Sequence, residues 1–185
     1  PSFLTGSTAV STQYRNGQSG LSGAGEIYVA PDSDAGNGAP RAEGQYSWGL
    51  SSTPIGFSFS YDSDGGFAGQ GLLTSTLGGS SAVYGDTVNE VMSSGLSFNA
   101  LQFNVEDRDN GTESFTLTQL IINGLTVTGG PWGGDSAFSD WGVTGLAVFS
   151  DFTISGEIVR NGSAAGTQQS RPRLDLIVGN VAPVP

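Results

Sequence analysis

Glycine-containing turn pairs recur along the whole chain and divide it into short segments. Asn-Gly pairs begin at positions 16, 37, 110, 123 and 161, and Gly-Gly pairs begin at positions 65, 78, 129 and 133. Such pairs adopt the positive φ angles of tight hairpin turns, which residues with a Cβ atom disfavour. The spacing of these turns leaves room for many short strands and for almost no helix.

The segments between the turns alternate with a period of two, which is typical of a strand with one buried face. Residues 55–61 (IGFSFSY) place four large side chains on one face and glycine or serine on the other. The same alternation occurs in 101–105, 115–118, 152–154 and 174–178. We therefore predict an all-β fold, an antiparallel β-sandwich or jelly roll of about ten strands, formed by a single domain over residues 26–180.

One segment has helical spacing instead. Val88, Val91 and Met92 are separated by three and four residues, and Asp86 is a suitable N-cap. The pattern predicts one short helix near 87–94, closing one end of the sandwich.

The two ends of the chain differ from the centre. Residues 1–25 are rich in Gly, Ser and Thr, with apolar Phe3, Leu4 and Val10 spaced along them. We predict that they form an extended N-terminal arm able to add to the sheet edge of a neighbouring molecule. The alternative is that they fold back onto their own sheet. Residues 181–185 form a proline-rich C-terminal tail.

The composition excludes several classes of function. The 185 residues include six arginines but no lysine, histidine or cysteine. Nucleophile systems built on His or Cys, Schiff-base lysines and thiolate or imidazole metal sites are therefore absent. A net charge of −11 makes binding to nucleic acid unfavourable, and no apolar stretch is long enough to span a bilayer.

The same composition points to an extracellular location. Abundant Gly, Ser and Thr, together with the absence of lysine and cysteine, are typical of secreted or cell-surface bacterial proteins. The chain begins at Pro1 with no initiator Met, so we expect a mature form from which a leader has been removed.

Three Asp-x-Asp-x-Gly turns are candidate sites for a structural Ca²⁺, because carboxylates two residues apart let a loop curl around a hard cation. The alternative is that Asp and Gly merely build the turns. The candidate ligands are Asp32, Asp34, Asp62, Asp64, Asp107 and Asp109, with Glu106 and Glu113 flanking the third turn.

A glycine-rich segment at 129–142 carries three aromatic residues, Trp132, Phe138 and Trp141. Exposed aromatic rings on a rigid sandwich can stack on sugars or anchor a protein interface. The alternative, slightly favoured, is that the tryptophans fold back and cap the core.

Three segments resemble, in order, the core of bacterial surface proteins called choice-of-anchor domains, and most closely the W subtype. They are 46–62 (YSWGLSSTPIGFSFSYD), 97–125 (which includes FTLTQLIINGL) and 152–179 (FTISGEIVRNGS to LDLIVG). The tail 181–185 (VAPVP) is similar to the stretch that precedes a sorting signal of PEP-CTERM type. The resemblance implies a β-sandwich, export and surface sorting, and supplies no catalytic residues.

These observations lead us to expect a secreted structural protein of the cell surface or extracellular matrix. It would self-assemble by β-strand addition into a filament or sheath, because the strands lack the lysines that usually protect sheet edges. The alternative is a calcium-braced carbohydrate-binding module that recognises a polysaccharide through Trp132 and Trp141. A glycoside hydrolase, using paired carboxylates, is a remote alternative, and we do not expect an enzyme.

Overall fold

The computed structural model describes residues 4–6, 8–18, 21–36, 40–48, 52–107, 113–133, 139–162 and 172–182. The strands in this part of the chain are β1 (Val10–Gln18), β2 (Leu21–Ala30), β3 (Ala42–Ser47), β4 (Pro54–Asp62), β5 (Leu72–Leu77), β6 (Ser80–Tyr84), β7 (Ala100–Glu106), β8 (Glu113–Ile122), β9 (Leu125–Thr126), β10 (Trp132–Gly133), β11 (Ser139–Val143), β12 (Phe152–Gly162) and β13 (Arg173–Gly179). A single 3₁₀ turn, η1, spans Phe67–Gly69.

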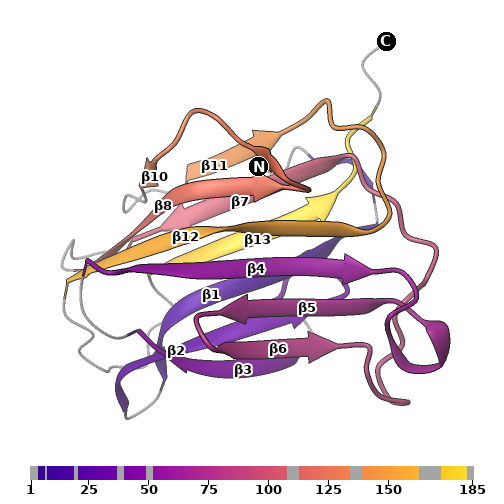
Figure 1. The fold of residues 1–185 in the computed structure, drawn as a ribbon, viewed down its shortest axis with the longest axis horizontal. Coiled ribbons are helices and arrows are strands. Elements are labelled where there is room, and N and C mark those ends of the chain that lie inside the picture. Colours follow the sequence, from indigo (N-terminus) through magenta and orange to yellow (C-terminus); the bar gives the residue numbers. More distant parts are fainter. Residues whose placement is uncertain are drawn as a thin grey trace.

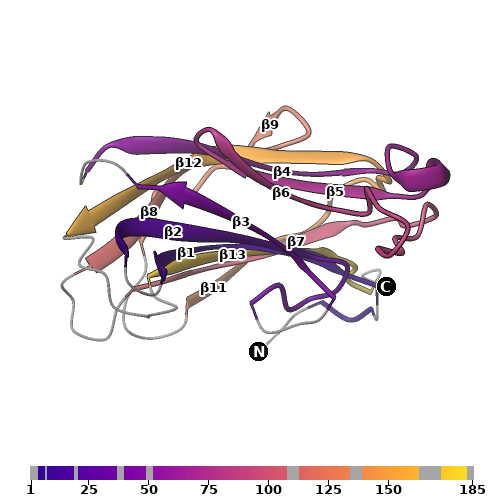
Figure 2. The ribbon, with the colours of Figure 1, turned by 90° about the horizontal axis from the view of Figure 1, so that it is seen from below.

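The strands form two antiparallel sheets that pack face to face (Figures 1 and 2). Sheet A has the order β11-β7-β13-β1-β2-β3, and sheet B has the order β10-β8-β12-β4-β5-β6, with β9 paired to β8. The predicted antiparallel β-sandwich is therefore confirmed. It contains thirteen strands in the described residues rather than about ten.

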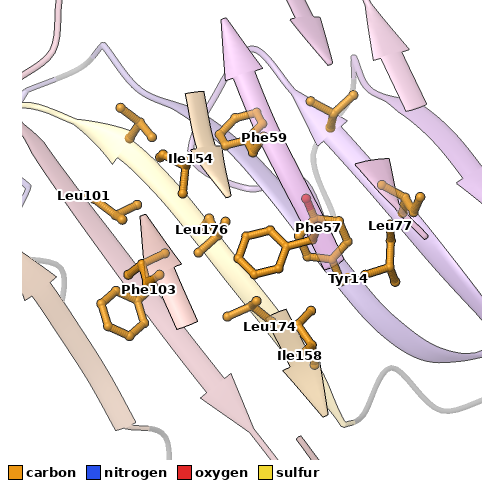
Figure 3. Close-up of a cluster of buried hydrophobic side chains, with 14 of the residues drawn as sticks. Tyr14, Phe57, Phe59, Leu77, Leu101, Phe103, Ile154, Ile158, Leu174 and Leu176 are labelled. Atoms are coloured by element: carbon orange, nitrogen blue, oxygen red, sulfur yellow. The ribbon is translucent and has the colours of Figure 1, made fainter. Parts of the chain in front are cut away.

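The core lies between the sheets and is built from the inward positions of the alternating strands. Phe57, Phe59 and Tyr61 of β4 are at most 3 % exposed. Phe57 and Phe59 face Leu174 and Leu176 of β13 across the sandwich (Figure 3). Burial of each such side chain stabilises the fold by about 1.5–3 kcal/mol. The large side chains that recur with a period of two in the sequence thus form this interior.

A group of hydroxyls crosses the core and ties the two sheets together. The Thr12 and Ser75 hydroxyls lie 2.6 Å apart, and the Ser75 hydroxyl donates to the Tyr14 oxygen at 2.8 Å. The Tyr14 hydroxyl in turn donates to the carbonyl of Ser58 at 3.0 Å, and Thr12 donates to the carbonyl of Tyr28 at 2.8 Å. β1 is thereby bonded to β4 and β5 of the opposite sheet.

The described residues between 4 and 25 lie mostly in two strands of sheet A rather than in a long arm, and this corrects the prediction for them. Residues 10–18 are β1, which lies in sheet A between β13 and β2. Val10 and Tyr14 are completely buried, and the Thr5 amide donates to the carbonyl of Asn180 at 2.8 Å. The alternative, in which this stretch folds back onto its own sheet, describes residues 4–6 and 8–18. Phe3 lies outside the described residues.

The helix expected near 87–94 is also corrected, because the described residues contain no α-helix. Val88 and Val91 are 67 % and 73 % exposed, and Met92 alone of the three is buried. The Met92 amide donates to the side-chain oxygen of Gln70, and its carbonyl accepts from the amide of Gly71. The backbone amide and carbonyl of Met92 are therefore paired with the neighbouring loop and not with other turns of a helix.

One lateral side of the sandwich is closed by direct backbone contact between the sheets. β3 and β6 are the last strands of sheets A and B on this side, at the bottom of Figure 1. A Cβ atom on Gly44 of β3 would overlap the carbonyl oxygen of Ser81 in β6. The glycine is required because the two backbones approach too closely to admit a side chain.

We predict that Gly44→Ala destabilises the protein by about 1–3 kcal/mol, the usual cost of inserting a methyl group into a filled space. Gly79→Ala is the matched control, since a Cβ there meets no atom within 4 Å. Denaturant unfolding of both variants measures the difference. Equal stabilities would contradict the proposed close approach.

Candidate ligand-binding site

The first two Asp-x-Asp-x-Gly turns are stabilised by their own backbone. The Asp34 amide donates to the Asp32 carboxylate at 2.8 Å, and the Asp64 amide donates to the Asp62 carboxylate at 3.3 Å. Such bonds shape a turn without any ion. Among the described residues, no group of three or more carboxylates comes close enough together to hold a metal.

The third turn lies partly outside the described residues, which do not include Asp109. Asp107 accepts a hydrogen bond from the Phe115 amide at 3.0 Å. Glu106 lies on the outer face of sheet A, 2.7 Å from the Arg173 guanidinium. Glu113 shares the inward face of β8 with Phe115 and Leu117. The two flanking glutamates therefore point to different sides of the sandwich.

The two tryptophans of the glycine-rich segment pack around the same core side chain. The Phe103 ring lies 5.2 Å from the Trp132 ring and 5.6 Å from the Trp141 ring. Trp132 is 7 % exposed, and Trp141 is partly buried against the core. These positions correspond to the alternative in which the tryptophans cap the core. Phe138 lies outside the described residues.

A different set of polar residues comes together on the outer face of sheet A, in a cross-strand row. Gln13 pairs directly with Asp175, Asp175 with Asn104, and Asn104 with Asp140, so the row crosses β1, β13, β7 and β11. Side chains at directly paired positions on one face of a sheet are neighbours. Amides and carboxylates thus alternate along the row.

The loop that follows β2 covers one end of this row. The Ala35 amide donates to the Ser11 hydroxyl at 2.9 Å, and Ala35 is buried with Tyr28 and Ala30. A Cβ atom on Gly36 would lie 2.7 Å from the Gln13 amide nitrogen, so the loop presses directly on that side chain. The row and the loop enclose a pocket of about 270 Å³.

Two hydrogen bonds within the row leave two amide oxygens without a partner. The Gln13 amide nitrogen donates to Asp175 at 2.6 Å, and the Asn104 amide nitrogen donates to Asp140 at 3.1 Å. Gln13 and Asn104 are each only 4 % exposed. Gln13 Oε1 and Asn104 Oδ1 are nevertheless buried without a hydrogen bond. Because most buried polar atoms are hydrogen-bonded, these two oxygens are candidate acceptors for a molecule in the pocket.

A second row of charged residues borders the pocket. Glu26 pairs with Arg15, Arg15 with Arg173, and Arg173 with Glu106. Arg15 Nε lies 2.5 Å from the Glu26 carboxylate, and Arg173 Nε lies 2.7 Å from the Glu106 carboxylate. The Arg173 Nε atom also lies 3.1 Å from Asp175, which links the charged row to the pocket.

Burial raises the pKa of the Asp175 carboxyl from 3.8 to about 6. The positive charge of Arg173 and the hydrogen bond from Gln13 act in the opposite direction, and the negative charges of Glu106 and Asp34 add to the effect of burial. Asp175 therefore changes its charge at a mildly acidic pH.

This pocket was not among the sites predicted from the sequence. Gln13, Asn104 and Asp175 occupy the polar positions of alternating strands, where they look like an ordinary solvated face. The alternation itself was a usable signal for their common outward direction. The register between four strands, and the loop that buries the face, are not visible in the residue pattern.

A comparison with protein-family models gives no match, and a comparison with curated proteins gives no significant match. The resemblance to choice-of-anchor domains therefore stays a prediction carried by its own motifs. No helix long and apolar enough to cross a membrane occurs in the described part of the chain.

We predict that Asp175→Asn stabilises the protein in a pH-dependent way. The raised pKa means that ionisation of Asp175 lowers the free energy of unfolding as the pH rises through about 4 to 6. The stability gained by the variant over wild type grows by up to about 3 kcal/mol across this range. Asp86→Asn, at an exposed carboxylate, controls for the lost charge. Denaturant unfolding across the range measures the gain, and a gain independent of pH would contradict the prediction.

Proposed function

We propose that this chain is a secreted structural subunit of a bacterial cell surface or matrix, which self-assembles by strand addition at one edge of its sandwich. The observation that carries the proposal is the difference between the two lateral sides. On one side the edge strands β3 and β6 approach each other at Gly44 and Ser81. On the other side β11 ends sheet A with no further strand among the described residues.

The β11 edge has few of the features that normally prevent strand addition. Lysine, proline and inward-pointing charges are the usual protections, and β11 (SDWGV) contains none of the three. Its single charged residue, Asp140, points to the outer face together with its partner Asn104. Half of the backbone groups of such an edge strand point away from the sheet and can pair with another chain.

The segment that follows β11 extends this surface. Val148 is 73 % exposed, and the next residue, Phe149, returns to the sheet through two backbone hydrogen bonds with Phe98, of 2.8 and 2.9 Å. Residues 144–148 therefore form a loop beside the edge, in which Leu146 packs against the core and Val148 is exposed. A loop carrying an exposed valine favours an interface, because its burial would stabilise an assembled state.

The net charge of −11 opposes close association at low ionic strength. We therefore propose that assembly is favoured by salt, which screens this repulsion. A structural Ca²⁺ stays a proposal for the third Asp-x-Asp-x-Gly turn, at Asp107 and Asp109. We propose no catalytic step for the chain.

We predict that Thr144→Lys combined with Val148→Lys raises the protein concentration needed for assembly by about tenfold or more, the effect of roughly 1.4 kcal/mol per contact. Both positions are exposed beside the β11 edge. Light scattering with electron microscopy measures assembly, and addition of EDTA tests the calcium proposal in the same samples.

Thr87→Lys combined with Val88→Lys is the control, because it changes the net charge equally at exposed positions far along the chain from β11. The control pair is expected to assemble like wild type or more readily. A wild-type protein that stays a monodisperse monomer at every salt concentration would contradict the proposed function. So would an equal loss of assembly in the two double variants.

A further inference from the structure

The outer-face pocket of sheet A is the second feature that points to a partner. It lies on the outer face of the sheet, and the row that lines it ends at Asp140 of the edge strand β11. It is enclosed by the cross-strand row of Gln13, Asp175, Asn104 and Asp140 and by the loop at 33–36. The four residues of this row come from four different segments of the sequence, and no site predicted from the sequence combines them.

The chemistry of the pocket favours a ligand that donates hydrogen bonds. Gln13 Oε1 and Asn104 Oδ1 are buried acceptors without a partner, and Asp175 lies between these two residues in the row. A buried acceptor left unsatisfied costs about 1–3 kcal/mol. A molecule with several hydroxyl groups could donate a hydrogen bond to each of these two oxygens and so remove that cost.

The charges in the pocket select against anions. Asp34, Asp140 and Asp175 contribute carboxylates, whereas Arg173 is the one cation among the pocket's described lining residues and is ion-paired with Glu106. A phosphate or an acidic sugar would meet an excess of negative charge. These three carboxylates line the pocket without coming close enough together to hold a metal ion, and no other described group of three does so.

The size and the apolar part of the pocket indicate a single sugar ring. The volume of about 270 Å³ lies just below the range of roughly 300–1,000 Å³ that is typical of sites for drug-sized ligands. Ile177 and Ala35 add an aliphatic patch to the otherwise polar lining. A sugar combines hydroxyl donors with apolar C–H faces, which matches this mixture.

We propose that the outer-face pocket binds one unit of a neutral, hydroxyl-rich glycan, with Gln13 Oε1 and Asn104 Oδ1 accepting hydrogen bonds from its hydroxyl groups. This site differs from a stacking platform on Trp132 and Trp141, which pack on the inward Phe103. Here recognition is by hydrogen bonds on the opposite face of β7.

The test begins with wild-type protein on an array of neutral and acidic oligosaccharides, followed by calorimetry with the neutral sugars that bind. Gln13→Met and Asn104→Leu each remove one orphan acceptor and keep a similar side-chain volume. Gln45→Met is the matched control, because Gln45 is exposed on the same face of sheet A but is not a pocket residue. We expect neutral sugars to bind and each pocket variant to weaken binding by about tenfold, with no change in the control.

Three results would overturn the proposal: no binding of any neutral sugar, binding of acidic sugars only, or binding that survives both pocket substitutions. Should a pocket variant fail to fold, the wild-type protein still decides the question. The side-chain amide NMR signals of Gln13 and Asn104 must shift on titration with the bound sugar, and unchanged signals would place the sugar elsewhere.

Discussion

Three buried hydroxyl groups hold the two sheets in one relative position. Thr12 and Tyr14 project from β1 into the core, where they meet Ser75 of the opposite sheet. Apolar side chains alone permit neighbouring packings of similar energy, but a buried hydroxyl that loses its partner is costly. The network therefore fixes the register of β1 against sheet B.

The position of β1 determines both faces of sheet A. Because successive side chains of a strand point to opposite faces, inward Thr12 and Tyr14 place Gln13 on the outer face, opposite Asp175. The same alternation in β13 and β7 carries the row on to Asn104. The position of the polar row thus follows from the buried hydroxyl network that fixes β1.

The residue pattern predicted the sandwich because large side chains such as Phe57 and Phe59 alternate with serine, and only an inward face explains that alternation.

The same pattern did not predict the strand at residues 10–18, because the inward positions there include Thr12, whose hydroxyl is buried by a tertiary contact with Ser75. The pattern wrongly predicted a helix near 87–94, because Val88 and Val91 have helical spacing although both are exposed. Neither tertiary contacts nor exposure can be obtained from spacing alone. For the same reason the pocket was missed, since it depends on the register of four strands and on a loop pressed against Gln13.

The two lateral sides of the sandwich have different roles in the proposed assembly: the side at β3 and β6 is closed, and the edge at β11 is open to a neighbouring chain. Hydrogen exchange, compared between dilute and assembled protein, tests this assignment most directly. We expect exchange to slow on assembly in residues 139–149 and to stay unchanged in β6, Ser80–Tyr84. Slowing confined to β3 and β6, or no change at β11, would contradict it.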